Sequence, residues 1–308
     1  MARTAPAYPS SPARAAGFGG IVPSTVVARD PSALVAALAV EHYADGALVM
    51  LLVLSETPGV LALDPLDDIE VHDDLGRRYD ARLAHGQAGL GSAQAALWIE
   101  PGLPADARVL DVGILELARV TSPRGGGGVT RPLHGGPWRL AIDLVPPRTR
   151  VPVPSRPGSA RPGQASPARV PARTLRAFRD LVPIGQARMR AGSVVCLHAL
   201  ERYDDLAILT LSTKMQDGDA HGAGAAPISA DTEGDRGNAA LIEVWDDRGA
   251  AYRAELEHSS GAEGWSDQMV RLTPALDPGA TSLGISVAAT QAGGGIWAVF
   301  GVALPLPR

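Results

Sequence analysis

The sequence holds one cysteine and no long apolar segment. Cys196 cannot form an internal disulfide, and a lone thiolate is too few for a cysteine-based metal site. The longest purely apolar run, Ala47–Leu54, is far shorter than the roughly 18 residues of a membrane-spanning helix. The first twelve residues contain three prolines and lack the continuous apolar stretch of a secretion signal. We therefore expect a soluble, cytoplasmic protein with no disulfide and no membrane span.

Aromatic residues and lysine are also scarce. Phe, Trp and Tyr make up 4% of the chain, and Lys214 is the one lysine among 28 basic residues. We attribute the excess of arginine to codon usage in a GC-rich genome, without functional meaning. The 35 glycines and 26 prolines favour many turns over long helices. At roughly 100–200 residues per domain, 308 residues predict two domains.

Four blocks of sequence occur twice in the same order, which indicates a tandem duplication. The copies are offset by 160 residues in the first two blocks and by 173 in the third, after an insertion. The pairs are Phe18–Pro23 with Phe178–Pro183, Glu41–Asp45 with Glu201–Asp205, Ile69–Tyr79 with Ile242–Tyr252, and Trp138–Leu144 with Trp297–Leu304.

The duplication divides the chain into four parts. We predict a disordered N-terminal tail over 1–16, a first repeat over 17–145, a basic proline-rich linker over 146–177 and a second repeat over 178–308. Short β-type runs separated by turn signals predict eight strands in each repeat. They are expected near 21–28, 34–42, 47–55, 68–72, 78–84, 94–100, 108–116 and 137–144, and near 181–188, 193–202, 206–213, 240–245, 251–257, 267–273, 281–288 and 296–303.

This pattern predicts an all-β protein of two tandem immunoglobulin-like antiparallel β-sandwich domains. The alanines of Ala33–Val40 favour a helix, but the matching segment Val194–Leu200 is β-branched at its start. Duplicated segments should share a conformation, so we expect strands in both. Matched aromatics, such as Tyr79 with Tyr252, are expected to anchor the two cores.

The clearest candidate ligands are two Asp-Asp-x-Gly elements, at Asp73–Gly76 and Asp246–Gly249. Their aspartates Asp73, Asp74, Asp246 and Asp247 are candidate calcium ligands. The favoured interpretation is a hairpin turn in which Asp accepts backbone hydrogen bonds and Gly takes a positive φ. Further carboxylates crowd residues 64–74 and the insertion at 217–235, where they either hold a cation or simply face water.

Candidate binding residues come from aromatics without a counterpart and from the linker. Trp98, Trp245 and Trp265 are candidates for a contact surface, although core packing is favoured for each. The linker has seven arginines and no acid, whereas each repeat has seven more acidic than basic residues. Arg148, Arg150, Arg156 and Arg161 are therefore candidates for binding an anionic polymer. The favoured alternative is a solvated linker that lies across the acidic faces, so nucleic acid is not the expected partner.

No catalytic motif accompanies these residues. The seven histidines lack zinc-site spacing, the serines lack a nucleophile elbow, and the glycine run Arg124–Gly128 has no phosphate-binding Gly-Lys-[Ser/Thr]. His198 is expected to be partly buried and hydrogen-bonded within a strand, and Cys196 to be an inert buried thiol. We therefore expect no cofactor.

The block order Asp-Asp-x-Gly-x-x-Tyr, then Pro-x-Leu and a strand, then a closing Trp strand resembles uncharacterised bacterial immunoglobulin-like modules. Some of these modules occur in the extracellular parts of anti-sigma factor-like proteins. The resemblance covers Ile69–Leu144 and Ile242–Leu304. It implies a sandwich fold without catalytic activity and assigns no functional residue.

The leading functional hypothesis is a non-enzymatic protein that acts by binding a protein partner or by assembly. A second hypothesis is a calcium- or carbohydrate-binding protein or hydrolase that uses residues 64–74 with Trp98 or Trp245. A third is anionic-polymer binding by the linker.

Overall fold

The fold is known from a computed structural model, and every regular element that it describes is a β-strand. The prediction of an all-β protein is therefore confirmed. Within the described part of the chain, no helix is long and apolar enough to cross a membrane. The described residues are 17–56, 60–62, 69–88, 91–115, 117–121, 129–133, 136–145, 151–157, 175, 177–190, 193–215, 241–262, 265–288 and 296–305.

The first repeat forms one nine-stranded antiparallel sheet and a small three-stranded sheet. The large sheet has the order β1-β3-β4-β8-β7-β6-β9-β12, with β2 also paired to β3, and the small one has the order β11-β10-β5. The strands are β1 Gly20–Pro23, β2 Val27–Arg29, β3 Ala33–His42, β4 Ala47–Ser55, β5 Val60–Ala62, β6 Ile69–Asp73, β7 Arg78–Ala88, β8 Ser92–Glu100, β9 Val109–Ile114, β10 Leu117–Thr121, β11 Val129–Leu133 and β12 Trp138–Asp143.

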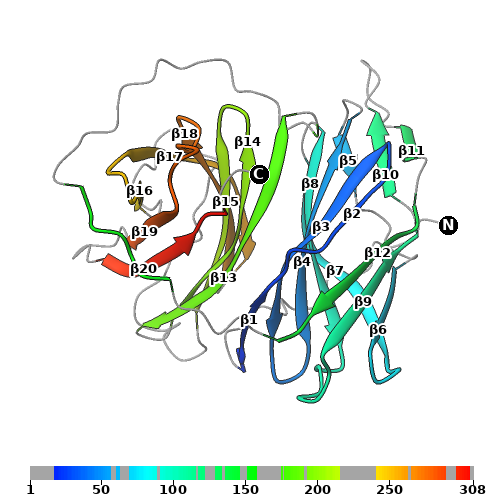
Figure 1. Ribbon diagram of the computed structural model, residues 1–308. Coiled ribbons are helices and arrows are strands. Elements are labelled where there is room, and N and C mark those ends of the chain that lie inside the picture. The colour runs from blue at the N-terminus through cyan, green and yellow to red at the C-terminus, as the bar shows by residue number, and fades with distance from the viewer. Residues whose placement is uncertain are drawn as a thin grey trace.

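The second repeat forms a single eight-stranded antiparallel sheet. Its order is β13-β14-β15-β18-β17-β16-β19-β20, which repeats the order of the first sheet strand for strand (Figure 1). The strands are β13 Phe178–Arg190, β14 Ser193–Tyr203, β15 Ala207–Met215, β16 Leu241–Asp246, β17 Ala251–Ala262, β18 Trp265–Thr273, β19 Ser282–Ala288 and β20 Ile296–Ala303.

Irregularities of the two sheets also coincide. The register shifts between Ala37 and Ala39 in the pairing of β3 with β4, and again 160 residues later at Leu197 and Ala199. A second shift, after Leu83 in β7, recurs 173 residues later after Leu256 in β17. Shared bulges at shared offsets support the duplication that the sequence predicts.

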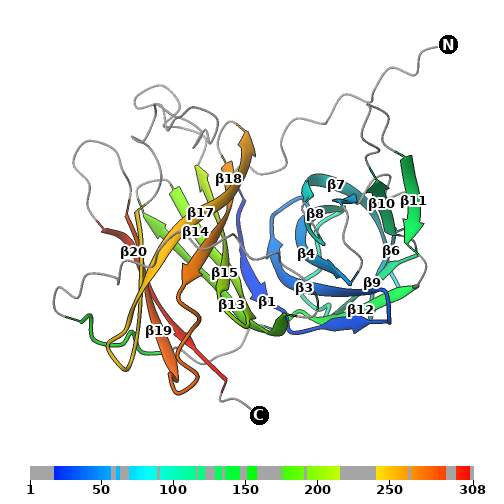
Figure 2. The ribbon, with the colours of Figure 1, turned by 90° about the horizontal axis from the view of Figure 1, so that it is seen from above.

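Both sheets curl upon themselves (Figure 2). In the first repeat β12 comes to lie against β2 and β3, and in the second β13 lies against β20. The result is barrel-like, because one sheet wraps a core that a sandwich would enclose between two sheets. The all-β class is thus established, whereas the immunoglobulin-like sandwich is not confirmed.

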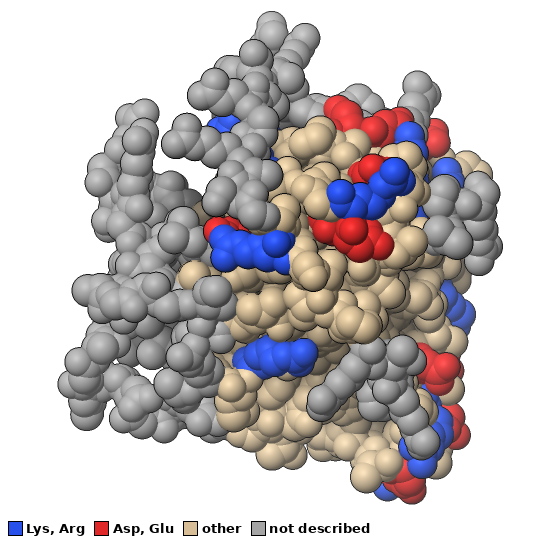
Figure 3. All heavy atoms as spheres, turned by 60° about the vertical axis from the view of Figure 1, so that its left-hand side comes forward, with Lys and Arg blue, Asp and Glu red and all other residues tan. Residues whose placement is uncertain are grey.

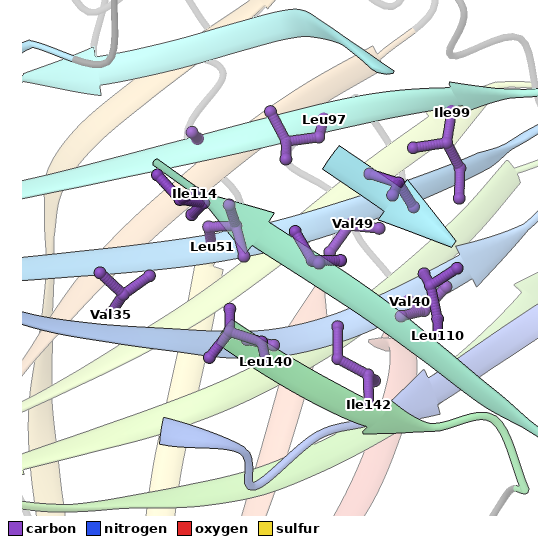
Figure 4. Close-up of a cluster of buried hydrophobic side chains, with 14 of the residues drawn as sticks. Val35, Val40, Val49, Leu51, Leu97, Ile99, Leu110, Ile114, Leu140 and Ile142 are labelled. Atoms are coloured by element: carbon purple, nitrogen blue, oxygen red, sulfur yellow. The ribbon is translucent and has the colours of Figure 1, made fainter. Parts of the chain in front are cut away.

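The cores follow from alternation along the strands. In β12 every second residue is buried, so Trp138, Leu140 and Ile142 point inward and their neighbours face solvent. Figure 4 shows Leu140 and Ile142 among the buried side chains of the first repeat, together with Val35, Leu51 and Leu110. The second repeat has an equivalent core around Phe300 and Ile285.

Several sequence predictions need correction. The single strand expected over 21–28 is two strands, β1 and β2, and the strands β5, β10 and β11 were not predicted. Residues 33–40 form a strand and not a helix, as the repeat predicted. The tail 1–16, most of the linker, residues 64–68 and the insertion 217–235 lie outside the described residues, so the predictions made for them are untested.

The central strands have no solvent-facing side. All nine residues of β4 are buried, as are nine of the ten residues of β3, and β14 is similar. One face of β3 lines the core of its own repeat, and the other face belongs to clusters that include residues of the second repeat. Figures 1 and 2 place β1 beside β13, where the repeats meet. The two repeats therefore pack face to face.

Candidate functional site

The two repeats pack through equivalent surfaces, and a polar cluster is enclosed between them. Its apolar surroundings include Ile21 and Ala39 of the first repeat, which pack with Val194 and Cys196 of the second. We call the enclosed polar group the interface cluster, which comprises Glu41, Tyr43, Gln94, His198, Glu201, Thr210, Ser212 and Lys214. Its members come from β3, from Tyr43 directly after β3, and from β8 on one side, and from β14 and β15 on the other.

Glu41 is the centre of this cluster. Its Oε2 accepts hydrogen bonds from Lys214 Nζ and, at 2.7 Å, from Tyr43 OH. Its Oε1 lies 3.2 Å from Ser212 Oγ, which donates to it, and 3.1 Å from His198 Nε2. A carboxylate of the first repeat is thus held by three side chains of the second.

Burial by itself would raise the pKa of the Glu41 carboxyl, but the charge of Lys214 and the contact with His198 outweigh it and lower that pKa below 4.5. Burial would likewise lower the pKa of Lys214, and the facing carboxylate of Glu41 raises it above 10.5. Both groups are therefore ionised near neutral pH. The interface encloses an ion pair whose two partners come from different repeats.

The ring of Tyr43 completes the environment of the cation. Lys214 Nζ lies 5.1 Å from the ring centroid, and the Tyr43 hydroxyl also accepts a hydrogen bond from this ammonium group. Burial, followed by the charge of Glu41, raises the pKa of Tyr43, so the hydroxyl stays protonated and can donate to Glu41.

The second repeat repeats the Glu-x-Tyr unit with a different partner. Tyr203 OH donates to Glu201 Oε2 at 2.7 Å, the distance found for Tyr43 and Glu41. Glu201 Oε1 accepts a hydrogen bond at 3.0 Å from Gln94 of the first repeat. The amide nitrogen of Gln94 also lies 3.0 Å from Thr210 Oγ1. Each repeat therefore contributes a glutamate that is satisfied by the other repeat.

Glu41, His198 and Ser212 have the residue types of a hydrolytic triad but a different geometry. Ser212 Oγ and Glu41 Oε1 both face the same ring nitrogen, His198 Nε2, at 3.0 and 3.1 Å. In a triad the acid binds the other nitrogen and orients the ring. Here Nδ1 is buried without a hydrogen-bond partner in the described structure. This favours a proton on Nε2, because a proton on Nδ1 would lack an acceptor.

The chemically capable side chains of the cluster are also shielded from solvent. The exposed fraction is 0% for Glu41, Cys196 and His198 and 1% for Lys214. Burial raises the pKa of the Cys196 thiol, so the reactive thiolate is disfavoured. General acid–base or nucleophilic chemistry requires a reacting atom within hydrogen-bond reach, and in the described part of the chain these side chains are not exposed to solvent. The expected hydrogen bond of His198 and the burial of Cys196 are confirmed, and His198 is fully buried where partial burial was expected.

A further polar contact joins the two repeats. His85 of β7 contacts Asp267 of β18 through Nε2 and Oδ2. Asp267 is buried and His85 is partly buried. The polar contacts between the repeats therefore extend beyond the interface cluster.

Sequence reasoning missed this cluster, although two signals of it were visible. Lys214, the only lysine, is the one charged residue of strand β15, and its counterpart at offset 160 is Leu54. His198 similarly replaces Leu38. Because the first repeat forms the same strands with leucine at these two positions, the fold does not require a polar residue at either of them.

The Asp-Asp-x-Gly elements are hairpin turns. Asp73 Oδ1 accepts the backbone N–H of Leu75 and Arg77 at 3.0 and 2.8 Å, and its Oδ2 accepts Tyr79 OH at 2.6 Å. Gly76 has a φ of 79°. The same contacts recur around Asp246, with Arg248, Ala250 and Tyr252 as donors, and Gly249 has a φ of 87°. The predicted turn with a positive-φ glycine is confirmed.

The second aspartate of each turn also accepts hydrogen bonds from the backbone. Asp74 Oδ1 accepts the backbone N–H groups of Arg108 and Val109, and Asp247 accepts those of Thr281. Across the described residues, no group of three or more His, Cys, Asp or Glu side chains is placed to hold a metal ion. The calcium site at these aspartates stays a prediction that their hydrogen bonds do not support.

Two of the three unmatched tryptophans are enclosed by the chain itself. Trp98 is 2% exposed, donates from Nε1 to Glu100 Oε1 at 2.7 Å and packs on Tyr43, with ring centroids 5.4 Å apart. Trp245 is 5% exposed and donates from Nε1 to the carbonyl oxygen of Pro154 at 3.0 Å. The side chain of Trp265 lies outside the described residues. A contact surface made of these three rings stays a prediction.

The linker contributes one described arginine. Arg156 Nη2 pairs with Glu243 Oε1 at 2.5 Å, as expected of a linker that crosses an acidic face, while Arg148, Arg150 and Arg161 lie outside the described residues. On the face drawn in Figure 3, described basic side chains lie apart from one another, several beside acidic ones. This face offers no continuous basic track, so binding of an anionic polymer stays a prediction without support from it.

Comparison with known proteins assigns no family. No family model matches the chain, and no curated protein matches it. Among solved structures, it is similar to one described as the crystal structure of the conserved domain protein from Bacillus anthracis. The TM-score is 0.33 and the identity 10%, over 92% of each chain. Similarity at this level supports no argument about fold or function.

Proposed function

We propose that this chain is a non-catalytic binding protein, in which two repeats act as one rigid unit and present their outer surfaces to a protein partner. The observation that supports the proposal is the burial of the side chains that could act as acids, bases or nucleophiles. Glu41, His198, Cys196 and Lys214 are enclosed between the repeats and are 0–1% exposed. Groups placed in this way hold two surfaces together and are closed to a substrate.

The interface cluster also suits a scaffold that must keep one geometry. Buried charges and hydrogen bonds penalise alternative packings, because a slip between the repeats would separate Glu41 from Lys214 and Glu201 from Gln94. Fixing the repeats before binding reduces the entropy that association costs. The immunoglobulin-like character suggested by the sequence remains part of this proposal, as a prediction.

The test couples partner identification to an activity screen. The purified full chain is used for affinity capture, and each captured protein is then purified and titrated against the chain by calorimetry. We expect saturable binding to one partner and no turnover in a panel of hydrolase and transferase assays. His198→Gln and Cys196→Ala serve as matched variants. Turnover by the wild-type chain that either variant removes, together with no reconstituted binding, would contradict the proposal.

A further inference from the structure

The linker segment 151–157 lies on the second repeat as a short extended strap. Figures 1 and 2 show it running beside β19 and β20. Its sequence is Val-Pro-Val-Pro-Ser-Arg-Pro, and Val151, Pro154 and Pro157 are its less exposed residues. Burial at every third residue is the period of a polyproline II helix, which has three residues per turn. One face of the strap is therefore turned toward the sheet.

The surface beneath the strap is a row of three residues on adjacent strands. Trp245 of β16 pairs in register with Gly284 of β19, which pairs in register with Gly301 of β20. We call these residues the Trp245 row. A Cβ at Gly284 would lie 2.3 Å from the indole ring, and one at Gly301 would lie 2.5 Å from the carbonyl oxygen of Val151. The two glycines thus leave the space that the indole and the strap fill.

The contacts with the strap are those that recognise a proline-rich chain. Trp245 Nε1 donates to the carbonyl oxygen of Pro154 at 3.0 Å. Pro152, Pro154 and Pro157 lack an N–H, which interrupts any ladder that the segment could add to the sheet, and their carbonyl oxygens and rings remain available for recognition. Arg156 adds polarity, since it pairs with Glu243 and its Cζ lies 6.0 Å from the Trp245 ring centroid.

The first repeat shows that the fold does not require this row. Its equivalent strands carry His72, Asp111 and Ala141 in the same register. Asp111 and Ala141 are exposed there, and His72 is partly exposed. Neither Gly284 nor Gly301 has a positive φ, so backbone conformation does not call for glycine. The indole and both glycines are features of the second copy alone, and they coincide with the strap.

The hold on the strap is shallow. It rests on one neutral hydrogen bond and on an ion pair whose side chains are 54% and 50% exposed, and such interactions are individually weak. A ligand of this kind stays bound mainly because it is tethered, which gives it an effective concentration of about a millimolar. A partner segment with the same chemistry can therefore take its place.

We propose that the Trp245 row is a recognition site for proline-rich segments in the polyproline II conformation that carry an arginine two residues after a proline. The strap is its resident ligand, and a partner protein's segment displaces it. This inference rests on the proposed function and names the site and the partner chemistry.

The probe is a synthetic heptapeptide, Val-Pro-Val-Pro-Ser-Arg-Pro, titrated by calorimetry into the full chain with residues 151–157 replaced by a seven-residue Gly/Ser sequence. We expect saturable binding by this variant. If the peptide binds it with a Kd of ~0.1 mM, the wild-type chain should bind about tenfold more weakly, because the strap competes at about a millimolar. A second route is Arg156→Glu in the otherwise intact chain, which removes the pair with Glu243 and should also strengthen peptide binding over wild type.

Matched controls come from the first repeat. In the Gly/Ser background, Trp245→His, Gly284→Asp and Gly301→Ala introduce the residues found at the equivalent register positions, and each should reduce peptide binding at least tenfold. A peptide with alanine in place of every proline should not bind. Circular dichroism and protection of Cys196 from thiol reagents verify folding.

Three results of the peptide titrations would each overturn the inference. The first is that the peptide binds neither the Gly/Ser variant nor Arg156→Glu, although both are folded. The second is that the alanine peptide binds as tightly as the proline peptide. The third is that Trp245→His leaves the affinity for the peptide unchanged. A partner from the capture experiment that binds Trp245→His as well as wild type would locate its site elsewhere. This last outcome would remove the inference and leave the proposed function standing.

Discussion

Replacement of Lys214 by leucine should strongly destabilise the protein, because it leaves the Glu41 carboxylate buried without its cation. Leucine is the residue that the first repeat carries at the equivalent position, Leu54, so the strand itself tolerates it. Breaking one side of a buried ion pair costs about 3–5 kcal/mol. With an unfolding entropy of ~2.1 cal/mol/K per residue, this corresponds to a fall in Tm of roughly 5–8 °C for 308 residues.

A double-mutant cycle separates the pair from general packing. Glu41→Gln alone should cost about as much, since it leaves the ammonium group buried without a counter-charge. The combination of Glu41→Gln with Lys214→Leu removes both charges and keeps an acceptor for Tyr43 OH, so its cost should fall well below the sum of the single changes.

Urea unfolding followed by circular dichroism measures these free energies, and the reactivity of Cys196 reports whether the interface opens before the repeats unfold. The pH dependence provides an independent check. Because the pKa of Glu41 is lowered on folding, its contribution to the free energy of unfolding is complete above pH 4.5. This contribution is lost as the pH falls through the pKa of Glu41 in the folded state. Because the pKa of Lys214 is raised on folding, its contribution to the free energy of unfolding is complete below pH 10.5. This contribution is lost as the pH rises through the pKa of Lys214 in the folded state. A loss below about 1 kcal/mol for Lys214→Leu, or strict additivity in the cycle, would refute the reasoning.

Three further predictions concern the turns, the thiol and one glycine. Asp73→Ala and Asp246→Ala should each cost roughly 1–3 kcal/mol by leaving a buried tyrosine hydroxyl and backbone N–H groups unsatisfied. Melting curves should not change with calcium, and a calcium-dependent rise in Tm that Asp73→Ala and Asp74→Ala abolish would support the metal site instead. Cys196, with its raised pKa and full burial, should react with Ellman's reagent only on unfolding, and rapid labelling of the native chain would contradict the closed interface. Gly46→Ala should cost about 1–3 kcal/mol in urea unfolding, because its Cβ would lie 2.3 Å from the Trp98 ring. Gly113→Ala, with its nearest neighbours at 3.7 Å, is the control and should cost less, and equal losses would contradict the packing argument.

Much of the fold was accessible from local pattern. Alternation and turn residues predicted sixteen strand segments, and described strands cover all of them, although one segment is split into β1 and β2. The three strands that were missed, β5, β10 and β11, are three to five residues long and belong to the small sheet of the first repeat. The curling of each sheet was missed as well, because it arises from contacts between first and last strands, such as β13 with β20.

The candidate site was less accessible, for a physical reason. Glu41 and Tyr43 were recognised as matched with Glu201 and Tyr203, but a match between copies does not reveal which side chains face each other across the contact. Lys214 and Glu41 are separated by 173 residues, so no local period links them. Trp245 was noticed as unmatched, and only its position under the strap shows what it binds.

The sequence by itself determined that the chain is all-β, that its two halves are copies of one unit, and that Asp73 and Asp246 shape turns. These features depend on residues close in the chain, or on comparison of one copy with the other. The tertiary structure alone decided that the copies pack through the same face, that the only lysine neutralises a glutamate of the other repeat, and that the linker occupies the Trp245 row. Such contacts join residues far apart in sequence, and they exist only once both sheets have formed and met.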